Sequence, residues 1–166
     1  MKICFSGTHG VGKTTAVLSK AHDMKLAFPE KDIGILMENA KHSPYPINKN
    51  GTLESQMWIF TNQMQKEIYL TSKYDILIGD RSVIDAIAYT YFVDKEAAES
   101  MFNFAKHHVN SYNIIYFKTL SNNDYLFDNG VRDSTDRSYR EGVERVLIGY
   151  YKRLIDEGLD LNIEYL

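Results

Sequence analysis

The sequence has few of the features that mark secreted, membrane-bound or strongly charged proteins. Cys4 is the only cysteine among 166 residues, which excludes a disulfide framework and is typical of a reducing compartment. The net charge of -3 gives no overall attraction to nucleic acid, although a local basic patch stays possible. No apolar run reaches membrane length, and no leader with a charged and an apolar part opens the chain. We therefore expect a cytoplasmic protein without membrane contacts.

Repeats, low-complexity tracts and interdomain linkers are absent as well, and strand-like segments alternate with helix-like ones. The hydrophobic content of 44% is enough for the core of one domain, which we expect to span residues 1–166. Strands are expected at 2–6, 33–37, 75–80, 113–117 and 161–166, and helices at 15–28, 52–72, 82–92, 94–108 and 139–157. This alternation favours an α/β fold with a parallel sheet. On the helix at 52–72 we expect a core stripe of Leu53, Met57, Phe60, Met64 and Ile68.

The most informative stretch follows the first expected strand. GTHGVGKT, from Gly7 to Thr14, fills every fixed position of the phosphate-binding pattern G-x-x-x-x-G-K-[ST]. Its glycines allow the backbone to wrap an anion at the start of a helix, while Lys13 can reach the β- and γ-phosphates and the Thr14 hydroxyl can ligate Mg²⁺. A glycine-rich turn could fit the pattern by chance, but the strand before it and the helix-forming run after it favour nucleotide binding. The expected contacts with ATP come from Gly7, Thr8, His9, Gly10, Val11, Gly12, Lys13, Thr14 and Thr15.

Charged residues directly follow two further expected strands, at the edge where open α/β sheets bind their ligands. Asp80 ends a nearly apolar strand, a position from which a carboxylate can ligate Mg²⁺ together with Thr14. The alternative for Asp80 is capping of the next helix. Glu38 could accept a proton from an attacking hydroxyl or hydrogen-bond the acceptor, or it could only stabilise a loop.

Arg81, beside the expected metal ligand, can hold a phosphate or acceptor oxygen with its guanidinium group, although a structural ion pair would also explain it. Hydrolytic P-loop motors usually place a second carboxylate here to polarise water, so the arginine favours transfer to a bound acceptor. The guanine-reading pattern N-K-x-D is absent after the fourth expected strand, where the sequence is KTLSNND. We therefore predict a phosphotransferase with Lys13, Glu38, Asp80 and Arg81 as catalytic residues.

A polar face of the helix at 52–72 carries Gln56, Gln63 and Glu67, with Trp58 nearby. Amide side chains can read the edge of a nucleobase and aromatic rings can stack on it, whereas a solvated helix surface would show the same pattern. The predicted acceptor contacts come from Glu38, Tyr45, Trp58, Gln63 and Arg81.

Arginines are interleaved with acids around a polar stretch at 121–138 that we interpret as a lid. On a loop that closes over the triphosphate, Arg132, Arg137 and Arg140 would neutralise charge on the transferred phosphoryl group, and we count them among the catalytic residues. On a solvated helix start they would only pair with the acids, the interpretation that we prefer for Arg145.

Together, the phosphate loop, Glu38, the triplet Asp80-Arg81-Ser82 and the stretch RDSTDRSYREGVERVLIGYYKRL resemble the thymidylate kinase and deoxynucleoside kinase group of P-loop kinases. The resemblance implies a three-layer P-loop NTPase fold with a five-stranded parallel sheet in the order 2-3-1-4-5. It also implies that Glu38 contacts the acceptor end and that Arg81 binds the phosphate or hydroxyl of the acceptor.

The segments MENAKHSPYPIN, TLESQMWIFTNQ and ILIGDRSVIDAIAY are similar to small bacterial and phage kinase-like ATPases that are grouped with nicotinamide riboside kinase domains. Some phage members resemble kinases that phosphorylate 5-hydroxymethyluracil within DNA. The chain departs from thymidylate kinases at Met37-Glu38-Asn39, where they carry Arg-Glu-Pro, and at Ser82, where they prefer an aromatic residue.

The sequence thus predicts a phosphotransferase that uses Mg²⁺ and ATP and acts on a hydroxyl or phosphate of a nucleoside, nucleotide or modified nucleobase. One alternative is a phage-type 5-hydroxymethyluracil DNA kinase that acts on the polymer, with Lys41, Lys49, Lys66 and Lys106 as candidate flanking contacts. Another alternative is a nucleotide-dependent binding module or regulatory ATPase, whose lid reports ATP occupancy to a partner.

Overall fold

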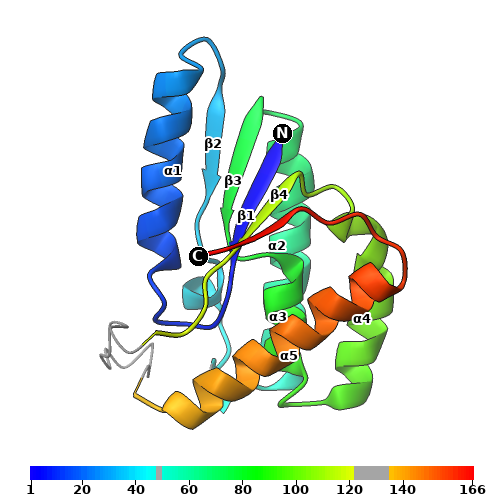
Figure 1. Cartoon of the computed structure of the whole chain (residues 1–166). Helices are drawn as coiled ribbons and strands as arrows, with labels where there is room; N and C mark the ends of the chain where they lie inside the picture. The colour runs from blue at the N-terminus through cyan, green and yellow to red at the C-terminus, as the bar shows by residue number, and fades with distance from the viewer. Residues whose placement is uncertain (48–49, 122–134) are drawn as a thin grey trace.

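The computed structural model describes residues 1–47, 50–121 and 135–166. Its centre is a sheet of five parallel strands (Figure 1). They are β1 (Lys2–Ser6), β2 (Ile33–Leu36), β3 (Ile76–Asp80), β4 (Ile114–Phe117) and β5 (Ile163–Tyr165), in the order β2-β3-β1-β4-β5. The predicted parallel sheet and the strand order implied by the resemblance are therefore confirmed.

Helices lie between the strands, as the alternation in the sequence predicted. The α-helices of the described residues are α1 (Lys13–Ala27), α2 (Leu53–Thr71), α3 (Val83–Thr90), α4 (Lys95–Val109) and α5 (Arg137–Asp156). A 3-10 helix, η1 (Ala40–His42), lies between β2 and α2. Their ends differ from the expected ones by one or two residues. None of these helices combines the length and the apolar composition that a bilayer span requires.

Successive residues of each strand point to opposite faces of the sheet, and both faces are covered. Ile3 and Phe5 of β1 pack with Val17 and Ala21 of α1 in one hydrophobic cluster. Cys4, between them, points the other way into a larger cluster that residues of α2, α3, α4 and α5 complete. Figure 1 accordingly shows α1 on one side of the sheet and the other helices on the opposite side.

Polar caps determine where several helices begin. Thr52 accepts a hydrogen bond from the backbone N–H of Ser55 at the start of α2, and Asp94 caps α4. At the start of α3, Ser82 and Asp85 form a reciprocal capping box. The alternative role of Asp80 as the cap of this helix is therefore wrong.

The buried face of α2 is not the one that its apolar spacing predicted. Phe60 is buried, but Met57 and Ile68 are 52% and 60% exposed. The buried residues of α2 are Ser55, Gln56, Ile59, Phe60, Gln63 and Glu67. Of its polar members, Ser55, Gln63 and Glu67 have hydrogen-bond partners inside the protein, and Gln56 lines a pocket. The polar face is thus not a solvated surface, and it borders the candidate site.

Candidate functional site

The phosphate loop joins the end of β1 to the start of α1. Gly7, Gly10 and Gly12 have φ angles of 140°, 79° and 78°, which residues with a side chain rarely adopt. A Cβ atom on Gly7 would also lie 2.4 Å from the carbonyl oxygen of Lys118. Gly12 is the N-cap of α1 and supplies no side-chain cap, so the first N–H groups of the helix are left for an anion. The loop therefore has the backbone geometry of a phosphate-binding site.

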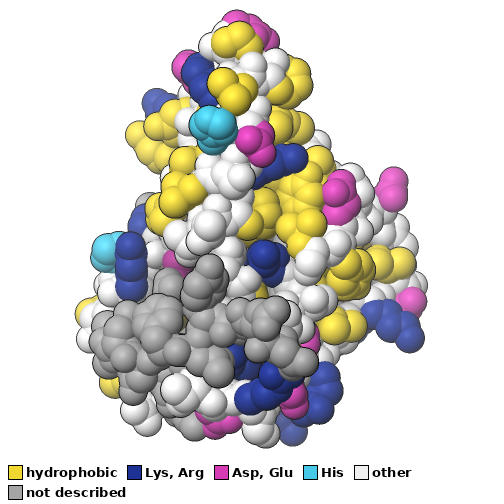
Figure 2. All heavy atoms as spheres, turned by 60° about the vertical axis from the view of Figure 1, so that its left-hand side comes forward, with side chains coloured by type: hydrophobic (Ala, Val, Ile, Leu, Met, Phe, Trp, Pro, Cys, Tyr) yellow, Lys and Arg dark blue, Asp and Glu magenta, His cyan; other side chains and the backbone are white. Residues whose placement is uncertain are grey.

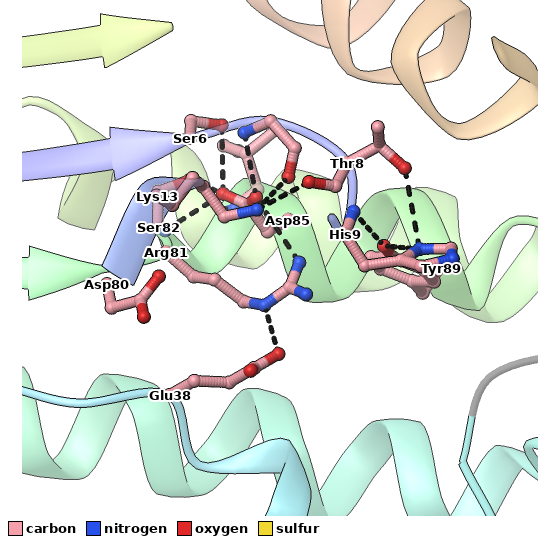
Figure 3. A network of polar contacts seen from close by, with 12 residues as sticks. Ser6, Thr8, His9, Lys13, Glu38, Asp80, Arg81, Ser82, Asp85 and Tyr89 are labelled. Carbon is pink, nitrogen blue, oxygen red and sulfur yellow. Dashed lines mark hydrogen bonds and ion pairs between the residues drawn. The ribbon is translucent and has the colours of Figure 1, made fainter. Parts of the chain in front are cut away.

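Lys13 is buried and lies across this loop (Figure 3). Its Nζ donates hydrogen bonds to the carbonyl oxygens of Gly7, at 2.8 Å, and Thr8, at 2.6 Å. The two carbonyls hold the ammonium group within the loop, beside the N-terminus of α1. Phosphate oxygens could replace these carbonyls as acceptors, which suits the predicted role of Lys13.

Thr14 and Asp80, the two predicted metal ligands, are in contact although they are 66 residues apart. Thr14 Oγ1 donates to Asp80 Oδ2 at 2.5 Å. A hydroxyl and a carboxylate are oxygen donors of the kind that Mg²⁺ takes together with phosphate oxygens and water. Within the described ranges there is no group of three or more His, Cys, Asp or Glu that could hold a metal alone. The donor set therefore fits an ion that arrives with a nucleotide.

Asp85 connects the phosphate loop to the start of α3. Its Oδ2 accepts hydrogen bonds from Ser6 Oγ at 2.8 Å and from the Ser82 backbone N–H at 2.9 Å, and its Oδ1 accepts from Gly7 N–H at 3.1 Å. Asp85 is fully buried. We did not predict this residue, although Ser82-x-x-Asp85 before an apolar run is a capping-box pattern that could have revealed it.

Arg81 extends between two carboxylates (Figure 3). Its Nε donates to Glu38 Oε1 at 2.6 Å, and its Nη1 lies 3.6 Å from Asp85 Oδ1. Nη1 is buried and makes no hydrogen bond with a described residue. Burial alone would lower the pKa of the Arg81 guanidinium, but Tyr89, Asp85 and Asp80 raise it above its ordinary value. The guanidinium is therefore charged, and one of its nitrogens has hydrogen-bonding capacity left.

The backbone of Arg81 is strained. Its φ angle of 96° is the only positive one among the described non-glycine residues. Such conformations cost free energy and are concentrated at functional sites. The ion pair that we considered as an alternative for Arg81 is present, but its partner is Glu38, which is also one of the predicted acceptor residues.

A pocket lies between the phosphate loop, the segment after β2, α2 and the start of α3. It is lined by His9, Glu38, Asn39, Ala40, Lys41, Ile47, Gln56, Ile59, Gln63, Arg81, Ser82, Ala86 and Tyr89. The fold thus brings together three of the five predicted acceptor residues, Glu38, Gln63 and Arg81.

The two glutamines of the pocket differ in how many hydrogen bonds their side-chain amides make within the protein. Gln63 Nε2 donates to Glu67 Oε1 at 2.8 Å and to the Arg81 carbonyl at 3.2 Å, and its Oε1 accepts from Asn39 Nδ2 at 3.0 Å. The amide of Gln56 makes no hydrogen bond with a described residue, although Gln56 is only 2% exposed. Gln56 therefore has both its donor and its acceptor available to a ligand, whereas Gln63 has little capacity left.

Tyr45 and Trp58 are not among the described residues that line the pocket. Tyr45 is exposed, and Trp58 packs against the hydrophobic cluster of α2 to α5. Trp58 lies two positions after Gln56, about 200° around the helix, so the two side chains cannot face the same pocket. These two predicted acceptor residues therefore lie outside the described lining of the pocket.

The arginines expected to act on the transferred phosphoryl group lie in different surroundings. Arg140 is 1% exposed, and its Nε donates to the His9 carbonyl at 3.0 Å, so α5 contacts the phosphate loop. Arg137 is exposed and pairs at 2.9 Å with a glutamate one turn along α5, which is the surface ion pair that we considered as the alternative. Arg132 lies outside the described residues. Arg145 is exposed and forms no ion pair with a described residue.

His9 belongs to both the phosphate loop and the pocket. Its backbone N–H donates to Tyr89 Oη at 3.1 Å, and its Nδ1 lies 2.8 Å from the same oxygen. Tyr89 projects from α3 and also lines the pocket (Figure 3). These contacts place the pocket directly beside the loop that the sequence assigns to the triphosphate.

A model of the AAA domain family matches residues 2–164. The chain belongs to the AAA domain family. The matched range includes the phosphate loop and Lys13 at the start of α1. No curated protein matches this AAA domain in sequence.

Solved structures similar to this AAA domain include deoxynucleoside and nucleotide kinases. Deoxyadenosine kinase from M. mycoides, with the products dCMP and a flexible dCDP bound, is 16% identical, with a TM-score of 0.61 over 100% of this chain and 89% of that chain. The same kinase with bound dATP is 16% identical, with a TM-score of 0.60 over 100% and 90%. Thymidylate kinase from Ehrlichia chaffeensis is 14% identical, with a TM-score of 0.66 over 100% and 91%. At these identities the likeness shows the fold, and the P-loop kinase fold implied by the resemblance is confirmed.

Proposed function

We propose that this protein is an ATP-dependent phosphotransferase that transfers the γ-phosphoryl group to a hydroxyl of a small, nucleoside-like acceptor. The observation that supports it most strongly is the pocket beside the phosphate loop, which contains the Glu38–Arg81 pair. A carboxylate and a guanidinium with a buried nitrogen that makes no hydrogen bond to a described residue are the groups that a hydroxyl acceptor needs next to a phosphoryl donor.

The donor half of the site consists of the phosphate loop, Lys13 and the N-terminus of α1. We infer that these groups hold the triphosphate of ATP and that Thr14 and Asp80 hold Mg²⁺. When bound, Mg²⁺ neutralises charge on the β- and γ-phosphate oxygens. Lys13 exchanges the carbonyls of Gly7 and Thr8 for phosphate oxygens when ATP enters.

The acceptor half consists of the pocket residues. The oxygen of the acceptor hydroxyl attacks the γ-phosphorus, the bond from this phosphorus to the oxygen bridging the β- and γ-phosphates breaks, and ADP leaves with that oxygen. The hydroxyl proton passes to the Glu38 carboxylate. Arg81 Nη1 donates a hydrogen bond to the attacking oxygen or to the transferred group, and the Gln56 amide holds the polar edge of the acceptor.

The charges around the pocket favour a hydroxyl acceptor over a phosphate acceptor. The guanidinium of Arg81 already lies between the carboxylates of Glu38 and Asp85. Lys41 is the other cationic side chain among the described lining residues. A phosphate monoester carries a charge of about -1.5 to -2 and would have to compete with Glu38 for Arg81. A neutral hydroxyl requires no such exchange.

Product analysis with labelled ATP tests this proposal. The protein is incubated with Mg²⁺, labelled ATP and, separately, nucleosides, nucleoside monophosphates and DNA that contains hydroxymethyluracil. The Lys13→Ala variant, prepared in parallel, detects contaminating kinases. We expect a labelled monoester from at least one nucleoside and no labelled product from the variant. Absence of an acceptor-dependent product across the whole panel would overturn the proposal.

The same panel separates the alternatives. Product from DNA alone, with a steep loss of activity at higher salt, would replace the proposed acceptor by the polymer. On the face drawn in Figure 2, lysines and arginines lie among acidic and hydrophobic side chains. Tight ATP binding with slow hydrolysis that no acceptor changes would instead identify a nucleotide-dependent binding module.

A further inference from the structure

A cluster of buried charges lies next to the pocket without lining it. Glu67 Oε2 is 2.9 Å from Lys2 Nζ and 2.7 Å from His108 Nε2, and Glu67 is 2% exposed. Tyr112 donates to the same carboxylate at 2.8 and 2.9 Å. None of these four residues is among the described residues of the pocket lining. Burying a carboxylate is costly even when it is paired, so the cluster calls for an explanation beyond packing.

Two hydrogen-bonded connections run from Glu67 to the turn between β3 and α3. In the first, Gln63 Nε2 donates both to Glu67 Oε1, at 2.8 Å, and to the carbonyl of Arg81, at 3.2 Å. In the second, the Tyr112 hydroxyl donates to Glu67 and accepts from the backbone N–H of Val83 at 3.1 Å. One carboxylate is thus connected to the backbone on both sides of Ser82.

This turn contains the strained residue of the site. Arg81 has a φ angle of 96°, and its side chain bridges Glu38 and Asp85 at the pocket. A strained conformation persists only when several contacts outside the residue hold it. Asp85 holds the Ser82 N–H from one side, and the connections from Glu67 hold the Arg81 carbonyl and the Val83 N–H.

We propose that Glu67 is a positioning residue of the acceptor half: through Gln63 and Tyr112 it holds the backbone at 81–83, and thereby the Arg81 guanidinium, in the geometry that binds the acceptor. The role rests on the proposed function, because it assigns Arg81 to the acceptor. It requires a carboxylate that only accepts hydrogen bonds. Burial alone would raise the pKa of Glu67, but His108 and Lys2 hold it below its ordinary value, so Glu67 is ionised at neutral pH.

The sharpest test removes one of the two hydrogen-bonded connections and replaces neither a pocket residue nor a charged residue. Tyr112→Phe deletes the hydroxyl between Glu67 and Val83 and leaves the ring in place. We expect kcat/KM for the acceptor to fall about tenfold, because a hydrogen bond to a charged group is lost, while KM for ATP stays within twofold. Tyr69→Phe is the matched control, since Tyr69 is 60% exposed and its hydroxyl has no hydrogen bond with a described residue.

Removal of the other connection provides a second variant. Gln63→Met keeps the volume of the side chain and deletes both of its donors, and Gln65→Met makes the same change at an exposed position of α2. Substitution of Glu67 itself is less informative, because the Lys2 ammonium would be left buried without its partner. We expect Gln63→Met to lower kcat/KM for the acceptor about tenfold and Gln65→Met to leave it unchanged.

Hydrogen exchange supplies a readout that needs no enzymatic activity. In Tyr112→Phe and Gln63→Met we expect the amides at 81–83 to exchange at least about fivefold faster, with the amides of β1 unchanged. This result together with an acceptor-specific kinetic loss supports the positioning role. Unchanged exchange at 81–83 in both variants would overturn it, and so would faster exchange throughout the chain with equal losses toward ATP and acceptor. If the wild-type protein forms no product, the proposed function fails, and the exchange rates still decide whether Glu67 holds this turn.

Discussion

The proposed donor half and the proposed acceptor half of the site are built in different ways. The donor half is one continuous stretch, from Gly7 to Thr14, in which glycine conformations and the backbone N–H groups at the start of α1 form most of the expected anion site. The acceptor half takes its side chains from the ends of β2 and β3, from α2 and from α3. A site made of contiguous backbone can be recognised from a local pattern, whereas a site made of dispersed side chains becomes visible only in the fold. The difference also implies that each half can be disabled without the other.

Loss of Lys13 has the largest expected effect and should act on the donor half alone. In Lys13→Ala the charge beside the β- and γ-phosphates is gone, and we expect kcat to fall about 1000-fold or more. Steady-state kinetics with ATP and the best acceptor of the panel measure this loss. Acceptor binding, measured by calorimetry, should stay within twofold of wild type. Lys152→Ala, on the exposed side of α5, is the control and should behave as wild type. Loss of acceptor binding in Lys13→Ala would show that the two halves are not separable.

Glu38→Gln is the complementary change in the acceptor half. The amide keeps the shape of the side chain but cannot accept the hydroxyl proton, so we expect kcat to fall about 100-fold. Acceptor and ATP affinities should both stay within about threefold. Glu30→Gln, at an exposed position, is the matched control. If acceptor affinity falls as much as kcat does, Glu38 positions the acceptor and the proton leaves by another route.

Features that depend on neighbouring residues in the sequence could be predicted, whereas features that depend on contacts between distant segments could not. The sheet and helices were predictable because apolar periodicity and helix caps such as Thr52 and Asp94 act locally. The apolar spacing of α2 misled us at Met57 and Ile68, because a sequence pattern does not show which polar side chains find partners inside the protein.

The arginines and Asp85 illustrate the same limit. Arg137 and Arg140 are three positions apart on α5, yet one pairs at the surface and the other is buried against the phosphate loop. No local pattern distinguishes them, since the difference depends on where α5 crosses the loop. Asp85 was recognisable as a helix cap, but its bond to the Gly7 N–H depends on the pairing of β1 with β3.

Gln56→Met is expected to have a smaller effect, confined to acceptor binding. The free amide of Gln56 lines the pocket, and its loss should raise KM for the acceptor about tenfold with little change in kcat. Gln65→Met again serves as the matched control. KM values for the acceptor that are equal in all three proteins would remove Gln56 from the acceptor half.

Lowering the pH should reduce the contribution of the buried Glu67 carboxylate to the stability of the protein. This is the smallest of the expected effects. Because the pKa of Glu67 in the folded protein lies below its ordinary value of 4.5, its contribution to stability is present above that value and is lost as the pH falls through the folded-state pKa. Urea unfolding of wild type and Glu67→Gln from pH 7 to pH 3 measures this contribution. The difference in unfolding free energy should be constant down to about pH 5 and shrink below pH 4.5. A difference that is constant over the whole range would contradict the ionised state of Glu67.

The most direct test of the central claim is phosphorus NMR of the wild-type protein with Mg²⁺, ATP and a nucleoside. Phosphoryl transfer to a hydroxyl predicts a new phosphomonoester resonance that grows in step with ADP, while inorganic phosphate stays at the level of the Lys13→Ala control. Growth of ADP and inorganic phosphate together, at a rate that the acceptor does not change, would contradict the account and identify a hydrolase.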